Sequence, residues 1–264
     1  MHKANITLGL WEGNLIVFPA YSYLEGVSGL PSARDILQQG LDRLGSPEDL
    51  ASRIDSTLLS PKATEEDVRN LVREASDYGF RCAVLTPVYT VRISGLAERL
   101  GVKLCSVIGF PLGHVPLEVK LVEAQTVLEA GATELDVVPH LSLGPEAVYR
   151  EVSEIVKLAK SYGAVVKVIL EAPLWDDETL SLLVDSSRRA GADIVKTSTG
   201  VYTKGGDPVT VFRLASLAKP LGMGVKASGG IRSGIDAILA VGAGADIIGT
   251  SSAVKVLESF KSLV

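Results

Sequence analysis

Histidine and cysteine are scarce in this sequence of 264 residues. The three histidines, His2, His114 and His140, are scattered along the chain. A metal-dependent enzyme needs several histidines or carboxylates at one site, so we expect no bound metal. The two cysteines, Cys82 and Cys105, are too few for a disulfide framework. They suit free thiols in a reducing compartment, which predicts a cytoplasmic protein.

Long apolar runs and concentrated positive charge are also missing. No stretch is apolar enough over a sufficient length to span a membrane, and residues 8–24 are interrupted by Glu12 and Pro19. We find no convincing cleavage site there and expect no signal peptide. The net charge is −5 without a basic run, so neither nucleic acid nor an anionic membrane is an expected partner. No dinucleotide fingerprint is present, and we expect no cofactor.

A short unit recurs along most of the chain. In each copy a helical stretch ends in a glycine that suits a helix C-cap, and a short β-branched run follows. Such short apolar runs are typical of strands that are covered on both faces. Seven copies occupy residues 78–85, 100–109, 130–138, 162–171, 190–198, 221–228 and 243–251. An eighth strand, over residues 52–59, would come first.

Amphipathic helices are predicted between these runs. After Thr64 as a candidate N-cap, Val68, Leu71, Val72 and Ala75 form one apolar stripe. Alternating strands and helices imply parallel strands with right-handed crossovers. Eight such units favour a closed α/β fold, the (β/α) TIM barrel, over an open sheet, which would usually carry a glycine-rich turn after its first strand.

The predicted domain organisation is simple. Residues 32–264 are expected to form a single TIM-barrel catalytic domain, and a helix over residues 32–45 is expected to cap the barrel floor. Residues 1–31 are expected to be an N-terminal extension of unknown role. The sequence does not decide whether that extension is an added strand, a segment that binds a partner or a loosely ordered arm.

Ionisable residues mark the predicted strand ends, where TIM barrels place their chemistry. Side chains alternate along a strand, so Lys196 and Lys226 are expected at similar depth on neighbouring strands. Lys167 lies one strand further back, and Asp136 and Asp55 are expected to face the same mouth. A structural ion pair between Lys196 and Asp136 is an alternative explanation for those two residues. It does not account for the other lysines.

Converging lysines have a chemical consequence. Burial and mutual repulsion both disfavour the ammonium form, so we expect each lysine to lower the pKa of its neighbour. A free amine attacks a carbonyl and forms a Schiff base. The Schiff base makes the adjacent carbon acidic, which permits aldol cleavage or addition. Asp136 is a candidate proton shuttle for these steps.

Loops rich in glycine and hydroxyl residues follow the last three predicted strands, at residues 197–200, 227–233 and 249–252. Glycines let backbone N–H groups approach an anion, and Ser251 and Ser252 open the last helix, whose N-terminus favours negative charge. TIM barrels often hold phosphate at the loops after strands seven and eight. The residues therefore indicate a phosphorylated carbonyl substrate.

The motifs of this chain resemble those of the deoxyribose-phosphate aldolase family. The resemblance runs from about residue 32 to the C-terminus. The matching motifs are, in order, IDSTLLSPKAT, VIGFPLG, GATELDVV, VKVILE, DIVKTSTG, VKASGGIRS and GADIIGTSS. It implies a metal-independent class I aldolase that interconverts 2-deoxy-D-ribose 5-phosphate with D-glyceraldehyde 3-phosphate and acetaldehyde. The family commonly forms dimers or tetramers, so a homo-oligomer is expected.

The resemblance also implies roles for individual residues. Lys196 matches the Schiff-base lysine, Lys226 the second lysine that perturbs it and transfers protons, and Asp136 the acid/base residue, acting through a water. The residues predicted to bind substrate are Asp55, Lys167, Thr199, Gly200, Gly229, Gly230, Gly249, Ser251 and Ser252. Strand two departs from the family pattern, because Thr86 stands before Pro87 where an asparagine is usual.

Two alternatives remain open at this point. One is a Schiff-base aldolase for another sugar phosphate, which pocket size would decide. The other is a catalytically silent phosphate-binding barrel that serves as a sensor or scaffold. The intact set of Lys196, Lys226 and Asp136 argues against a silent barrel, which need not keep it.

Overall fold

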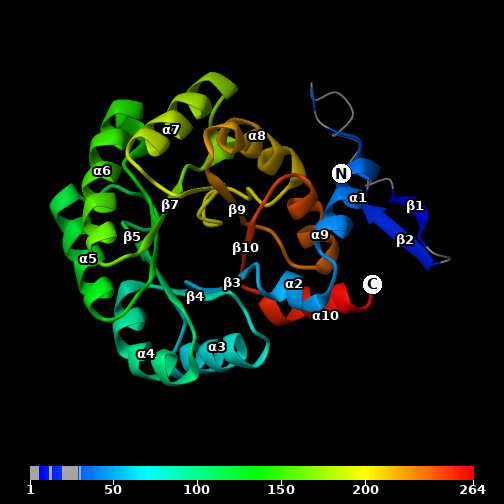
Figure 1. Ribbon diagram of the computed structural model, residues 1–264, viewed down its shortest axis with the longest axis horizontal. Helices are drawn as coiled ribbons and strands as arrows, with labels where there is room; N and C mark the ends of the chain where they lie inside the picture. Colours follow the sequence, from blue (N-terminus) through cyan, green and yellow to red (C-terminus); the bar gives the residue numbers. More distant parts are fainter. Residues whose placement is uncertain (1–5, 12–13, 20–28, 30) are drawn as a thin grey trace.

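The fold is an eight-stranded parallel barrel in a computed structural model that describes residues 6–11, 14–19, 29 and 31–264 (Figure 1). The strands follow one another around the barrel in chain order, and β10 pairs with β3 to close it. The strands are β3 Ile54–Leu58, β4 Cys82–Leu85, β5 Leu104–Ile108, β6 Glu134–Val137, β7 Val165–Ile169, β8 Ile194–Lys196, β9 Gly224–Ser228 and β10 Ile247–Thr250. The predicted TIM barrel is confirmed.

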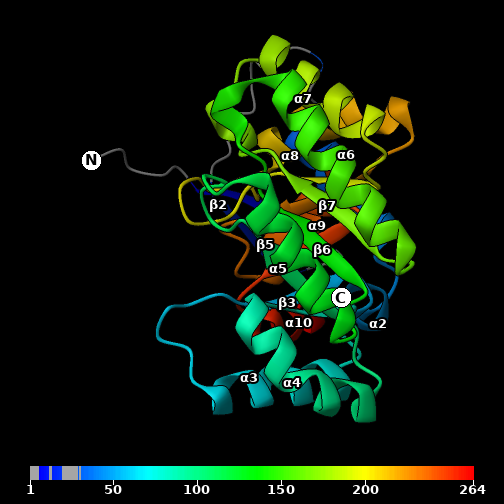
Figure 2. The ribbon, with the colours of Figure 1, turned by 90° about the vertical axis from the view of Figure 1, so that its left-hand side faces the viewer.

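Helices pack around the outside of this barrel (Figure 2). The main ones are α3 Glu65–Asp77, α4 Pro87–Leu100, α5 Leu117–Glu129, α6 Pro145–Ser161, α7 Asp177–Arg189, α8 Pro208–Ala218, α9 Gly234–Gly242 and α10 Ala253–Lys261. Short 3-10 turns lie at η2 Leu141–Leu143, η3 Ala172–Leu174 and η4 Lys219–Leu221. In α3 the predicted apolar stripe is buried, and Thr64 and Asp67 form a capping box.

The strands bury both of their faces. Residues such as Leu85 and Val168 point outward and share one hydrophobic core with the surrounding helices. Residues of the other parity point into the barrel, where Cys82, Val84 and Cys105 form a separate apolar cluster with Val107. This cluster fills the β4–β5 side of the interior. The opposite side, from β6 to β9 and β3, carries the ionisable groups.

The helix predicted to cap the barrel floor lies elsewhere. It is α1, Ala33–Arg43, and it packs against α9 on the outside of the helix ring (Figure 1). The two helices approach closely because glycines meet at their contact. A Cβ atom built on Gly242 would stand 1.8 Å from the carbonyl oxygen of Ile36, and one on Gly40 would stand 2.1 Å from that of Ile238. The capping position was therefore a wrong prediction.

Two further elements complete the description. The short helix α2, Pro47–Ala51, leads into β3. In the N-terminal extension, β1 Ile6–Trp11 and β2 Asn14–Pro19 pair in an antiparallel two-stranded sheet separate from the barrel. Within the described ranges, no helix has the length and apolar character required to cross a bilayer.

Candidate active site

One carboxylate connects three lysines inside the barrel. Asp136 on β6 is fully buried, and its Oδ2 accepts hydrogen bonds from Lys196 Nζ on β8 and Lys226 Nζ on β9, each at 2.8 Å. Its Oδ1 accepts from Lys167 Nζ on β7 at 2.9 Å. Strand pairing sets Lys196 level with Lys226 and Asp136 level with Lys167. The convergence predicted from alternation is confirmed.

A second tier of ion pairs lies toward the amino ends of the strands. Asp55 is the second residue of β3 and stands level with Cys82, the first residue of β4. It accepts from Lys226 Nζ at 2.6 Å and from the guanidinium of Arg81 at 2.7 Å. Asp55 was expected to face the same mouth as Asp136, and the two carboxylates share Lys226 Nζ inside the barrel.

Arg81 and Glu134 complete this lower tier. Arg81 precedes β4 and donates two hydrogen bonds to the carboxylate of Glu134, at 2.7 and 2.9 Å. Glu134 Oε2 also lies 2.6 Å from Lys167 Nζ. The Arg81 side chain is 20% exposed, whereas those of Glu134 and Asp55 are 4% and 0% exposed. Arg81 therefore closes the floor with its charged group turned inward.

Lys196 differs from the other two lysines in its electrostatics. Burial and the nearby ammonium of Lys226 lower the pKa of Lys196, and the carboxylate of Asp136, which it contacts, opposes them only in part. Burial acts on Lys226 as well, but Asp136 and Asp55 outweigh it and raise the pKa of Lys226. Lys167 behaves likewise, with Asp136, Asp55 and Glu134 raising its pKa well above the usual value.

A neighbouring lysine thus acts to lower the pKa of Lys196 and of Lys226, as expected, but only Lys196 ends with a lowered pKa, since Asp136 and Asp55 raise that of Lys226. The pKa values of the two lysines differ because Lys226 contacts two carboxylates and Lys196 contacts one of them. Asp136 carries its charge firmly, because Lys167, Lys196 and Lys226 together overcome burial and hold the pKa of Asp136 well below its ordinary value. The site pairs one amine of depressed basicity with a carboxylate and a stable ammonium.

The predicted phosphate loops meet beside these lysines. Gly200, with φ of +77°, lies against Gly229, where a Cβ on Gly200 would be 3.4 Å from the Gly229 Cα. The N–H of Gly206 donates to the carbonyl of Gly229 at 2.9 Å, so the β8–α8 and β9–α9 loops are bound to each other. A Cβ on Gly249 would stand 2.9 Å from the Cε of Lys226, which ties this position to the lysine cluster.

The other predicted loop residues are placed as follows. Ser252 takes the N-cap position of α10 without a side-chain cap bond, and its N–H donates to Thr250 Oγ1 at 3.0 Å. Ser251 lies next to it at the carboxyl end of β10. Thr199 is buried, and its N–H is already bonded to Glu171. Gly230 has φ of +93°, in the region that favours glycine.

Residues 51–259 match the sequence model of the DeoC/LacD family aldolases. The chain belongs to this aldolase family. It is 96% identical to a deoxyribose-phosphate aldolase of Aeropyrum pernix over 89% of this chain and 100% of the relative. A deoxyribose-phosphate aldolase of Thermococcus gammatolerans is 43% identical over 81% of this chain and 97% of the relative.

Solved structures agree with this assignment. The fold is similar to a structure described as the unique tetrameric structure of deoxyribose phosphate aldolase from Aeropyrum pernix, with a TM-score of 0.88, 96% identity and coverage of 89% of this chain and 100% of that one. It is also similar to an aldolase called QR15, with a TM-score of 0.75 at 37% identity, covering 81% of this chain and 96% of that one. The family resemblance found in the motifs is confirmed.

Two residues of this aldolase site were not predicted from the sequence. Glu171, just after β7, is buried at φ of +47°, the one non-glycine residue with positive φ in the described part of the chain. Its carboxylate accepts from the Thr199 N–H and the Thr203 hydroxyl and so anchors the β8–α8 loop. In the sequence it shares strand parity with Lys167 and ends the motif VKVILE, but neither feature indicates its contact with the loop. Arg81 gives no signal, because it lies in the bend just before β4, where strand alternation does not set the direction of its side chain.

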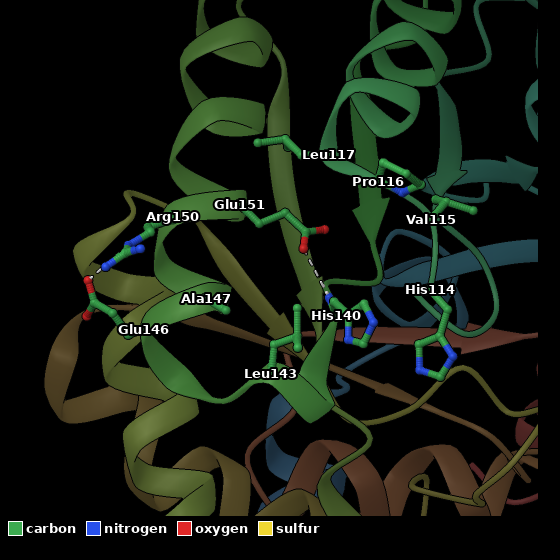
Figure 3. A pocket seen from close by; sticks show the side chains of 10 residues that line it. All are labelled: His114, Val115, Pro116, Leu117, His140, Leu143, Glu146, Ala147, Arg150 and Glu151. Carbon is green, nitrogen blue, oxygen red and sulfur yellow. Dashed lines mark hydrogen bonds and ion pairs between the residues drawn. The ribbon is translucent and has the colours of Figure 1, made fainter.

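A hollow of about 690 Å³ lies beside the barrel mouth, between the start of α6 and the loop leading into α5 (Figure 3). The rings of His114 and His140 stack there with centroids 4.5 Å apart. Glu151 accepts from the His140 N–H at 3.2 Å and pairs with the buried Lys120. None of the lysines that meet at Asp136 lines this hollow. Over the residues described, no three His, Cys, Asp or Glu side chains are grouped to hold a metal ion.

Proposed function

We propose that this chain reversibly cleaves 2-deoxy-D-ribose 5-phosphate into D-glyceraldehyde 3-phosphate and acetaldehyde, through a Schiff base on Lys196. The observation that carries the assignment is the contrast among three interior lysines. Lys196 alone of these has a lowered pKa, and it is the last residue of β8, at the mouth. Its side chain is 3% exposed, whereas those of Lys167 and Lys226 are 0% exposed. The family and the near-identical relative support the reaction.

The cleavage follows from these groups. The neutral amine of Lys196 adds to the aldehyde carbon of the open-chain sugar, and loss of water gives an iminium ion. Removal of the proton from the C3 hydroxyl breaks the C2–C3 bond. The bonding electrons pass to the iminium as an enamine, and glyceraldehyde 3-phosphate leaves. Protonation at C2 and hydrolysis then release acetaldehyde and return the amine.

The neighbouring groups supply the proton transfers. Asp136 stays ionised because its pKa is lowered, and the family resemblance implies that it moves a proton through a water. Lys226 stays protonated because its pKa is raised, and the family resemblance implies that it takes part in proton transfer. Asp55 and Lys167 are fully buried and contact these two groups. We assign them to holding the charged cluster in place rather than to direct substrate contact.

The substrate phosphate is assigned to the loops after β8, β9 and β10. Positive-φ glycines there bring backbone N–H groups close to an anion, and the N-terminus of α10 favours negative charge. The residues concerned are Gly200, Gly229, Gly230, Gly249, Ser251 and Ser252. Thr199 is assigned to positioning the loop, since its N–H is bound to Glu171.

Borohydride trapping tests the nucleophile. Incubation with acetaldehyde and borohydride should add one reduced two-carbon unit to Lys196, located by peptide mass spectrometry. The variant Lys196→Met should lose the adduct and the activity. Lys120 is the matched control, because it is equally buried but lies outside the cluster, and it should stay unmodified. An adduct on Lys167 or Lys226, or none, would refute the assignment.

The same preparation separates the alternatives. An aldolase for another sugar phosphate would trap acetaldehyde weakly and turn over another pentose phosphate faster than deoxyribose 5-phosphate. A silent barrel would bind phosphate without turnover. A chelator should leave the rate unchanged.

Assembly and location extend the proposal. The Aeropyrum pernix structure is described as a tetramer, which supports a tetramer for this chain, to be measured by light scattering. The buried free thiols of Cys82 and Cys105 support a cytoplasmic location. Residues 51–259, which match the family, support one catalytic domain within 32–264.

A further inference from the structure

The charges inside the barrel balance before Lys196 is counted. Three carboxylates and three other cations form one connected set of contacts. The carboxylates are Asp55, Glu134 and Asp136, and the cations are Arg81, Lys167 and Lys226. With these six groups ionised the sum is zero, and a protonated Lys196 would leave an uncompensated buried charge. Such a charge is strongly disfavoured in a dry interior.

Arg81 differs from the other members of this set. A guanidinium does not lose its proton in proteins, so Arg81 supplies a fixed charge. It donates to Asp55 Oδ1 at 2.7 Å and to both oxygens of Glu134. Its backbone N–H is held by the carbonyl of Ile54 at 2.9 Å, which sets the side chain under the barrel. If one basic group of the interior is uncharged, that group must therefore be a lysine.

We propose that Arg81 is a positioning residue that leaves Lys196 as the uncharged amine of the barrel interior, by neutralising Asp55 and Glu134 from the floor. The proposal rests on the proposed role of Lys196 as the nucleophile. Without Arg81, three carboxylates would face only Lys167 and Lys226. The interior would then be neutral only with Lys196 protonated, and the nucleophile would be lost at neutral pH.

Titratable groups from most strands of the barrel surround Lys196 in the interior. The groups are Asp55 from β3, Cys82 from β4, Cys105 from β5, Glu134 and Asp136 from β6, Lys167 and Glu171 from β7, Lys226 from β9 and Arg81 from the floor. Within the described structure, Asp136 is the one carboxylate in contact with Lys196. Burial and Cys105 keep the Cys82 thiol protonated by raising its pKa, so Cys82 adds no charge. Glu171 is bonded to the β8–α8 loop.

The pH dependence of kcat/KM for deoxyribose 5-phosphate tests the proposal. Its acid limb reports the free amine of Lys196, because only the neutral form attacks. In Arg81→Met we expect that limb to move about one pH unit higher, as for loss of one charge in a shared cluster. Activity on the limb should fall about tenfold and recover at higher pH. Arg81→Lys, which keeps the charge, should stay close to the wild type.

Two further variants keep the test valid even if Arg81→Met does not fold. Glu134→Gln alone removes one negative charge, and its acid limb should move to lower pH. The double variant Arg81→Met/Glu134→Gln restores a zero sum, and its limb should return toward the wild-type position. Circular dichroism and Tm identify the folded variants. A purely structural role for Arg81 would lower Tm and activity at every pH alike.

The results also separate this proposal from the proposed function. Suppose that acetaldehyde traps Lys196 in the wild type. If the acid limb of the pH profile then stays in place in folded Arg81→Met, or if Glu134→Gln shifts it in the same direction as Arg81→Met does, the role of Arg81 is refuted. The assignment of Lys196 as the nucleophile is unaffected by that result. If wild-type trapping fails, the proposed function is refuted first. Opposite shifts in the two single variants, cancelled in the double variant, would support the proposal.

Discussion

Replacing Lys226 by methionine should change the protonation of Lys196 by an amount that the geometry fixes. Both nitrogens bond to the same oxygen of Asp136 at 2.8 Å, so they lie no more than twice that distance, 5.6 Å, apart. Two unit charges at that separation repel by about 3 kcal/mol at an effective dielectric of about 20. Removing this repulsion favours protonation of Lys196 roughly 100-fold.

The assay is again the pH profile of kcat/KM. For Lys226→Met we expect an acid limb about two pH units higher and a loss of up to roughly 100-fold at pH 7. Part of that loss should be recovered as the pH rises. The variant should also be less stable by about 3–5 kcal/mol, because Asp55 and Asp136 each lose a buried partner. Thermal unfolding measures this cost separately.

Lys120→Met is the matched control. Lys120 is just as buried, but it pairs with Glu151, which lines the hollow beside the mouth, and it is not part of the interior cluster. It should lose stability while its pH profile stays unchanged. A loss of activity in Lys226→Met that is the same at every pH would refute the electrostatic reasoning. Lys226 would then act by donating protons without tuning Lys196.

Three further predictions concern the surroundings of the cluster. In Glu171→Ala the β8–α8 loop loses its anchor, so KM for deoxyribose 5-phosphate should rise several-fold at nearly constant kcat, with Glu171→Gln closer to the wild type. Gly242→Ala should lower the free energy of unfolding by about 1–3 kcal/mol, since its Cβ would meet the backbone of α1. Despite burial, cationic partners lower the pKa values of Asp55 and Asp136. The stability that these carboxylates contribute is therefore complete above about pH 4 and is lost as the pH falls through the lowered values. In Asp136→Asn the free energy of unfolding should accordingly depend less steeply on pH in the acid range.

Much of the barrel and its lysine cluster followed from local sequence patterns. Glycine caps and apolar runs located the strands, and alternation turned Asp136, Lys167, Lys196 and Lys226 inward. The alternation of side chains along one strand does not depend on the neighbouring strands, so it can be predicted from the sequence alone. For the same reason it says nothing about depth. The contacts of Asp55 with Lys226 and Arg81 depend on the register between strands, which closure of the sheet determines.

The remaining features depend on tertiary contacts. Arg81 lies in the bend before β4, where no periodicity sets the direction of a side chain, and only the closed barrel brings Asp55 and Glu134 to it. The position of α1 depends on glycines about 200 residues apart that let two helices touch. Glu171 adopts its left-handed backbone because the neighbouring loop holds its carboxylate.

The cluster also explains why a barrel with three interior lysines uses one of them. Lys167 and Lys226 are each within salt-bridge distance of at least two carboxylates, and these contacts overcome burial. Lys196 contacts one carboxylate that is shared with both of the others. Its reactivity is thus a property of the whole charge set and not of its own pocket. A substitution at the floor should tune the nucleophile at the mouth without touching the substrate, and this distinguishes charge balance from a purely local effect on Lys196.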